Sequence, residues 1–185
     1  GLGGMVSLAQ AAFVTMASLT TGLMLSHGLP FIPAAIIGCL AAALVGALVA
    51  LPSIRLGGLA LALSTLALAL IGDRVLFAWD AFRNSSNGWP IPRPSIGTLG
   101  FADDRMLAVL FAIVIAAVVW MIHNLQRSAS GREVSAVRTA PPAATAIGLS
   151  TTRSKLWIFA FSALVAGAGG VLLGAYGGSV TNLSF

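Results

Sequence analysis

Charged residues are scarce in this chain, and their absence excludes most water-soluble folds. Only 8% of the 185 residues are Asp, Glu, Lys or Arg, whereas soluble domains carry about 25%. None of these four residue types occurs before Arg55. A chain that is 58% hydrophobic has too few polar residues to coat a large water-soluble core. The composition therefore indicates a membrane protein.

The sequence also lacks the residue groups that most enzymes and metalloproteins require. It has no phosphate-binding loop, so we predict no ATP hydrolysis by that route. Cys39 is the single cysteine, which excludes a disulfide framework, and we expect it to act as a small buried hydrophobe. No predicted span holds two carboxylates, and no Ser, His and Asp residues have the spacing of a catalytic set. We therefore expect no catalytic residue, no metal and no cofactor in this chain.

Long apolar runs make up most of the chain. We place five spans at Met5–Leu25, Phe31–Leu51, Leu56–Leu76, Met106–Leu125 and Leu156–Tyr176. A helix of about 20 residues is about 30 Å long, which matches the hydrocarbon thickness of a bilayer. The predicted fold class is an all-α polytopic membrane helix bundle. The first run is too long for a signal peptide and has no basic residues before it, and we expect the chain to be part of a longer protein.

Small residues repeat at four-residue spacing in two of the spans. This spacing lets helix backbones approach one another closely, so it predicts tight packing, with a glycine-lined pathway as the alternative. The repeats are Gly38, Ala42, Gly46 and Ala50 in the second span, and Ala166, Gly170 and Gly174 in the fifth.

The basic residues predict which ends of the spans face the cytoplasm. The segment Arg127–Lys155 holds five of the ten Lys and Arg residues and one acid, Glu133. If the N-terminal end is inside, this segment and the Pro52–Arg55 turn form the cytoplasmic side, in agreement with the positive-inside rule. Orientation thus accounts for the pI of about 11.2 without a nucleic-acid partner. Taken alone, the segment could be a solvated connector that only sets the topology.

Two further features concern the outer side and the membrane interior. On the outer side, alternate prolines in Trp89–Pro94 predict an extended backbone. Inside the membrane, the amide of Gln10 needs a partner, so it either bonds to a neighbouring helix or faces a wet pathway. The candidate pathway residues are neutral, and they are Ser7, Gln10, Ser64 and Thr65. Such a lining suits a neutral or zwitterionic solute better than a metal ion.

Four patterns in this order resemble one family of transport proteins. The patterns are SLAQAAF at 7–13; LPSIRLGGL at 51–59 with LALSTLA at 61–67; SNG at 86–88 before the proline-rich stretch; and GRE at 131–133 with AVR at 136–138, AA at 143–144, AIGL at 146–149 and Lys155. Together they cover nearly the whole chain, and they resemble branched-chain amino acid ABC transporter permeases of the LivM type.

The resemblance implies a single transmembrane permease domain over residues 1–185, with the family pattern continuing beyond both ends. It implies a multi-pass subunit of an importer in the bacterial inner membrane, which carries branched-chain or other hydrophobic amino acids by alternating access. The implied partners are cytoplasmic ABC ATPases, a second permease and a periplasmic or extracellular solute-binding protein. ATP and Mg would bind in the ATPases, so this chain itself would not be an enzyme.

The resemblance also assigns a role to the cytoplasmic loop at residues 127–155. Importers of this kind carry a coupling helix with the pattern Glu-Ala-Ala, three residues, then Gly, and it fits a groove on the ATPase. In this chain proline takes the place of the glutamate, and no acidic residue stands just before it. Proline suits the first turn of a helix, and glycine suits the position just past its end. The predicted coupling residues are Arg132, Arg138, Pro142, Ala143, Ala144 and Gly148.

Other functions fit parts of the same pattern. An ion-coupled secondary transporter would also be a helix bundle, although the predicted spans hold few ionisable residues of the kind that such transporters use. A membrane scaffold without transport activity is a further alternative. Related permeases import urea, short amides or aromatic acids on the same scaffold, and neutral pathway residues do not separate these solutes.

Overall fold

The computed structural model describes residues 9–53, 58–72, 89–92, 95–96, 99–100 and 104–180, and helices make up most of this part of the chain. The helices are α1 (Gln10–Ser26), α2 (Phe31–Ser53), α3 (Gly58–Ile71), α5 (Asp104–Arg127), α6 (Ala129–Thr139), α7 (Pro141–Ala146) and α8 (Thr151–Gly177). The strands are two residues long: β1 (Trp89–Pro90), β2 (Ser95–Ile96), β3 (Leu99–Gly100) and β4 (Ser179–Val180). The predicted all-α class is confirmed.

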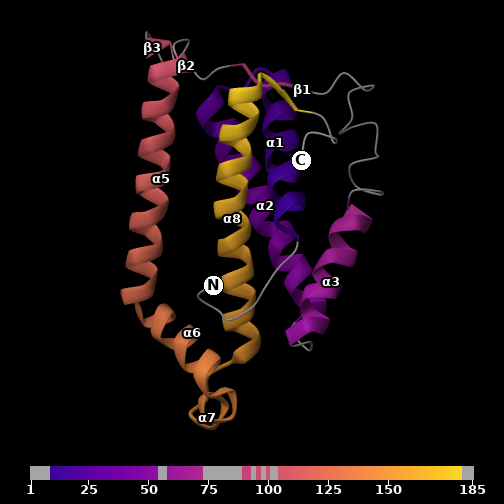
Figure 1. Cartoon of the computed structure of the whole chain (residues 1–185), viewed down its shortest axis with the longest axis vertical. Coiled ribbons are helices and arrows are strands. Elements are labelled where there is room, and N and C mark those ends of the chain that lie inside the picture. The colour runs from indigo at the N-terminus through magenta and orange to yellow at the C-terminus, as the bar shows by residue number, and fades with distance from the viewer. Residues whose placement is uncertain are drawn as a thin grey trace.

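Three helices, α1, α2 and α8, form the centre of the bundle (Figure 1). Small residues form many of their contacts. Gly46 of α2 lies against Ala163 of α8, and Gly167 of α8 lies against Ala42 and Ala17. No room is left for a larger side chain at these points, because backbone and Cβ atoms of the neighbouring helix occupy it. The packing interpretation is therefore confirmed at Ala42 and Gly46 of the repeat in α2, whereas their partners on α8 lie outside the predicted repeat of that helix.

The other long helices lie at the edge of the bundle. Helix α3 packs against α2, while α5 runs beside α8 and touches it only sparsely (Figure 1). Large apolar side chains are exposed over much of the α5 surface, among them Val109, Ile113, Ile115, Val119 and Trp120, whereas Leu107 is buried. An apolar helix of this length that has few protein neighbours is suited to hydrocarbon.

Three described helices are long and apolar enough to cross a membrane, and they are Phe31–Leu51 within α2, α5 and α8. They correspond to the second, fourth and fifth predicted spans. The described helices of the first and third predicted spans, α1 and α3, have 17 and 14 residues. The predicted ends of those spans at 5–8 and 73–76 lie outside the described residues, so the count of five spans is approximate.

The strands close one end of the bundle. Trp89 and Pro90 pair antiparallel with Val180 and Ser179, and the Ile91 amide donates to the Gly178 carbonyl at 3.0 Å. Ile91 is fully buried and packs with Leu19 and Ala175. The extended backbone predicted here is thus confirmed for Trp89 and Pro90, while Arg93 and Pro94 lie outside the described residues.

The basic segment lies at the opposite end of the bundle. Helices α6 and α7 project below the long helices in the view of Figure 1, whereas β1 and β4 lie at the top. The end of α2 and the start of α3 lie on the same side as α6, because Ala50, Leu61 and Phe159 form one buried cluster there. This arrangement places the described ends of α2 and α3 on the same side as the Arg127–Lys155 segment, in agreement with the positive-inside interpretation. Arg55 itself lies outside the described residues.

Candidate functional site

Only Ser128 separates the end of α5 from the start of α6, and hydrogen bonds between nearby residues stabilise this turn. The Ser128 hydroxyl accepts from the Gly131 amide at 3.2 Å and caps the helix. Gly131 lies directly against the carbonyl oxygens of Leu125 and Gln126, where a side chain would clash. Arg132 donates from Nη1 to the Arg127 carbonyl at 2.9 Å. The first two residues of the Gly-Arg-Glu pattern, Gly131 and Arg132, therefore stabilise the turn between α5 and α6.

Helix α7 is the short helix at the tip of the projecting end. It covers Pro141–Ala146, with both prolines in its first turn, where a missing N–H costs nothing. At its other end, Gly148 has a φ of +83°, and its amide donates to Thr145 while the Leu149 amide donates to Ala144. This pair of hydrogen bonds is a Schellman ending. A short helix thus lies where the coupling helix was predicted, although it begins at Pro141 rather than Pro142, and its coupling role stays a prediction.

The tip of α7 presents a small-residue surface with one large apolar side chain. Pro142, Ala143 and Gly148 are exposed, whereas Ala144 is buried. Ile147, the cap residue that directly follows the helix, is 74% exposed. An exposed isoleucine between small residues at the tip of a projecting helix can insert into an apolar groove of a partner. Ile147 lies in the AIGL pattern at 146–149 but was not among the predicted coupling residues.

One hydrogen bond joins the projecting unit to the start of α8. The Ser154 hydroxyl donates to Oε1 of Glu133 at 2.6 Å, a short distance typical of bonds to a carboxylate. Ser154 is buried in the first turns of α8, where Ser150 caps the helix by accepting from the Arg153 amide. A carboxylate near a helix N-terminus also interacts favourably with the helix dipole. Glu133, the single acid of the basic segment, therefore fixes α6 against α8.

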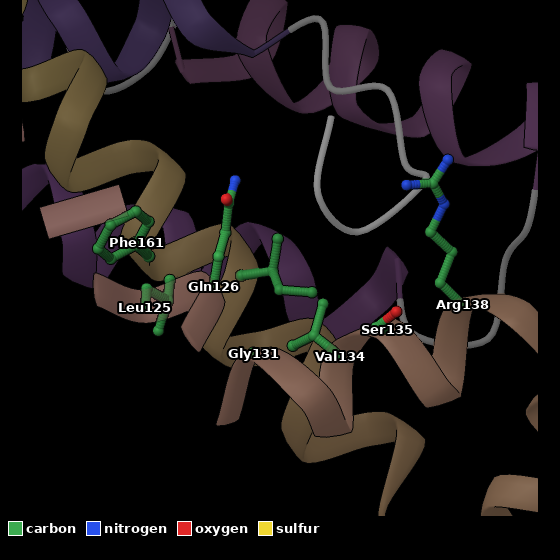
Figure 2. A pocket seen from close by; sticks show the side chains of 8 residues that line it. Leu125, Gln126, Gly131, Val134, Ser135, Arg138 and Phe161 are labelled. Atoms are coloured by element: carbon green, nitrogen blue, oxygen red, sulfur yellow. The ribbon is translucent and has the colours of Figure 1, made fainter. Parts of the chain in front are cut away.

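A cavity of about 230 Å³ lies where α5, α6 and α8 meet. Figure 2 shows Leu125 and Phe161 at one end of it and Arg138 at the other. Its remaining walls are Gln126, Gly131, Val134, Ser135 and Ile158. The cavity therefore has an apolar part toward the membrane helices and a polar part toward the basic segment.

Comparison with known proteins shows the family to which this chain belongs. Residues 1–185 match the family model described as branched-chain amino acid transport system, permease component. The chain belongs to this family. The LivM-type resemblance of the sequence patterns is thus confirmed over the whole chain, and the chain is a membrane protein.

Curated members of this permease family give the same result. The chain is 29% identical to the "high-affinity branched-chain amino acid transport system permease protein LivM" of Salmonella typhimurium and 30% identical to the protein of that name in Escherichia coli. Each alignment covers all of this chain and 49% of the relative, so the chain spans about half the length of the curated relatives it matches. No solved structure matches the chain.

The predicted pathway residues of the permease are placed on separate helices. Gln10 at the start of α1 donates from Nε2 to the Ser162 hydroxyl of α8 at 3.0 Å, which is the helix–helix alternative for its amide. On α3, Ser64 and Thr65 donate to carbonyls of their own helix, those of Leu61 and Ala62. Ser7 lies outside the described residues. A role of these residues in a pathway stays a prediction.

A second cavity of the permease, of about 340 Å³, lies between α1, α2 and α3. Its walls are apolar and include Phe13, Met16, Leu48, Val49 and Leu68. Neither Gln10 nor Ser64 nor Thr65 lines it. The described residues therefore show an apolar space beside the predicted pathway residues rather than among them.

Proposed function

We propose that this chain is the membrane-spanning part of an ABC importer subunit and that α7 is the helix on which the partner ATPases act. The observation that carries the proposal is the position of α7. A short helix of small residues, begun by prolines and ended by Gly148, projects from the basic end of the bundle. The membership in the permease family supports the same role.

The contacts of α7 could transmit a displacement of this helix to the membrane helices. Helix α7 is joined to α6 on one side and to α8 on the other, and the Glu133–Ser154 hydrogen bond holds α6 and α8 together. Helix α8 in turn packs on α1 and α2 through close backbone contacts. A displacement of α7 by an ATPase would therefore move α8 and change how the bundle opens. ATP and Mg, bound by the ATPases, supply the differential affinity that such an alternating-access cycle requires.

We infer that the solute is a branched-chain or other hydrophobic amino acid. The names of the two LivM relatives support this class of solute. The described helices α1, α2 and α3 carry no Asp, Glu, Lys or Arg, which suits a neutral or zwitterionic solute. On this proposal the chain works in the inner membrane with a second permease, two ATPases and an external solute-binding protein.

Two glycines provide a matched test of the α7 proposal. Gly148 and Gly28 both have a φ of +83°, and a Cβ at either position would meet no atom within 4 Å. Tryptophan should therefore strain the backbone equally at both sites, yet only Gly148 lies at α7. We expect Gly148→Trp to abolish co-purification of the ATPases from native membranes and Gly28→Trp to retain it. Ile147→Asp should weaken the association as well, because it places a charge in the apolar contact.

Equal ATPase recovery from the two tryptophan variants, with membrane insertion intact, would refute α7 as the docking helix. Uptake into proteoliposomes separates the importer from an ion-coupled transporter. The importer requires added ATPases and ATP, whereas a secondary transporter would work with the purified permease and an ion gradient alone.

A further inference from the structure

The cavity between α5, α6 and α8 lies at the level where the membrane helices become polar. On α5, it is lined by Leu125, the last residue of the apolar run, and by Gln126. On α8, Ile158 and Phe161 line it, three and six residues after Lys155, which is the last charged residue of that helix. At about 1.5 Å per residue, these positions lie within about 10 Å of Lys155. The cavity therefore sits at the boundary between hydrocarbon and the basic cytoplasmic segment.

The cavity is separate from the packed centre of the bundle. On α8, Phe159 and Ala163 face α2, whereas Ile158 and Phe161 are three residues apart and share a different face. Helix α5 forms the other wall, and its apolar side chains are exposed along most of its length. Hydrocarbon chains in the bilayer therefore have access to this side of the bundle without entering the region between α1, α2 and α8.

The lining combines features that match an amphipathic anion. Leu125, Ile158 and Phe161 offer an apolar wall, and Arg138 stands at the opposite end of the cavity (Figure 2). A guanidinium presents up to five N–H donors in a planar fork that matches phosphate oxygens. Gln126 and Ser135 add neutral polar groups beside it. The segment from Arg127 to Lys155, which includes part of the cavity wall, has five basic residues and one acid. The electrostatic potential of this segment therefore favours an anion.

We propose that this cavity binds an anionic phospholipid, with the phosphate at Arg138 and the start of an acyl chain against Leu125, Ile158 and Phe161. The lipid would fill the space between α5 and the α6–α8 corner, where protein contacts are sparse, and would hold α5 to the bundle. This site does not depend on the docking role of α7.

The test is native mass spectrometry of the full-length parent protein, purified in detergent, stripped of lipid and titrated with phosphatidylglycerol or phosphatidylcholine. We expect one phosphatidylglycerol to bind at least tenfold more tightly than phosphatidylcholine. Arg138→Gln should weaken phosphatidylglycerol binding about tenfold, because a charge-assisted hydrogen bond is lost. Arg153→Gln is the control, since it removes the same charge from the same segment at a residue that does not line the cavity.

A second pair of variants tests the cavity without changing charge. Ser135→Trp should fill it from its exposed rim and abolish tight binding, while Ser130→Trp, on the same helix and outside the cavity, should not. Equal binding of the two lipids, or equal loss in the Arg138 and Arg153 variants, would overturn the proposal. Displacement of the lipid by inorganic phosphate alone would also overturn it, because the site would then recognise a free anion.

Discussion

Gly169 and Gly170 are neighbours on α8 that differ in what a methyl group would meet. A Cβ at Gly169 would have no atom within 4 Å, whereas one at Gly170 would lie 2.5 Å from the Val14 carbonyl oxygen, 2.9 Å from Val14 Cα and 3.0 Å from the Ser18 hydroxyl. That carbonyl also accepts the Ser18 hydroxyl at 2.9 Å. Gly170→Ala would therefore force α1 away from α8, while Gly169→Ala would disturb no contact.

The expected sizes follow from two opposing effects. Alanine is favoured over glycine inside a helix by about 0.8–1 kcal/mol, and this gain applies at both positions. Overpacking at Gly170 costs about 1–3 kcal/mol, because the obstructing atoms belong mainly to the backbone of α1 and cannot rotate away. Gly169→Ala should therefore raise the free energy of unfolding slightly. Gly170→Ala should leave it unchanged or lower it by about 2 kcal/mol.

Unfolding in detergent is monitored through tryptophan fluorescence. Both alanine variants and the parent protein are measured in the same detergent. The difference between the two variants is the decisive quantity, because the helix-propensity gain cancels from it. A difference of about 1–3 kcal/mol in favour of Gly169→Ala is expected. Two variants of equal stability would show that α1 and α8 do not approach at Gly170 as described.

The remaining predictions concern hydrogen bonds between helices. Ser154→Ala removes the donor to Glu133 and should lower the free energy of unfolding by about 1–2 kcal/mol. The same variant should reduce ATP-driven uptake more than ATPase co-purification. Thr152→Ala is the control, because Thr152 is exposed in the same helical turn, and it should change neither stability nor uptake. Gln10→Leu should impair uptake more than ATPase association. Ser162→Ala breaks the same Gln10 bond while keeping the amide, so equal uptake defects in these two variants would show that Gln10 acts through the bond and not in a pathway.

The long apolar helices were predicted well from the sequence, because burial in hydrocarbon is a property of each segment alone. Helix α2 begins at Phe31 as predicted, after the Gly-Leu-Pro turn. Helix α8 begins at Thr151 rather than Leu156, because its first turn is polar and is specified by the Ser150 cap instead of hydropathy. Hydropathy locates the membrane part of a helix, and capping locates its true end.

The basic segment shows what local patterns can and cannot predict. Pro142 and Gly148 predicted both ends of α7 to within two residues, because proline and glycine each restrict or free the backbone at their own position. Helix α6 was missed, although Ser128 is a good cap, because it carries Gly131 in its interior and few apolar residues. The Glu133–Ser154 bond joins residues 21 positions apart, and nothing in the local sequence specifies such a pair.

Long-range partners were likewise beyond the sequence patterns. The extended stretch at Trp89 follows from its prolines, but its pairing with Ser179 and Val180 depends on the fold that brings α8 beside α1. In the same way, the small-residue repeats predicted close packing without naming the partner helix. On α8, Gly170 of the repeat packs against Val14 of α1, whereas Ala163 and Gly167, which lie outside the repeat, pack against α2.

The place of α8 at the centre of the bundle has a consequence for biogenesis. Gln10 and Ser162, which bond to each other, are 152 residues apart, so at about 5–20 residues per second a ribosome takes roughly 8–30 s to make the second after the first. If α1 and α2 insert as they are translated, the surface that will receive α8 faces lipid or the insertion machinery during that interval. The close contact between Gly38 and the Ala17 carbonyl would then hold α1 and α2 together before α8 has been translated.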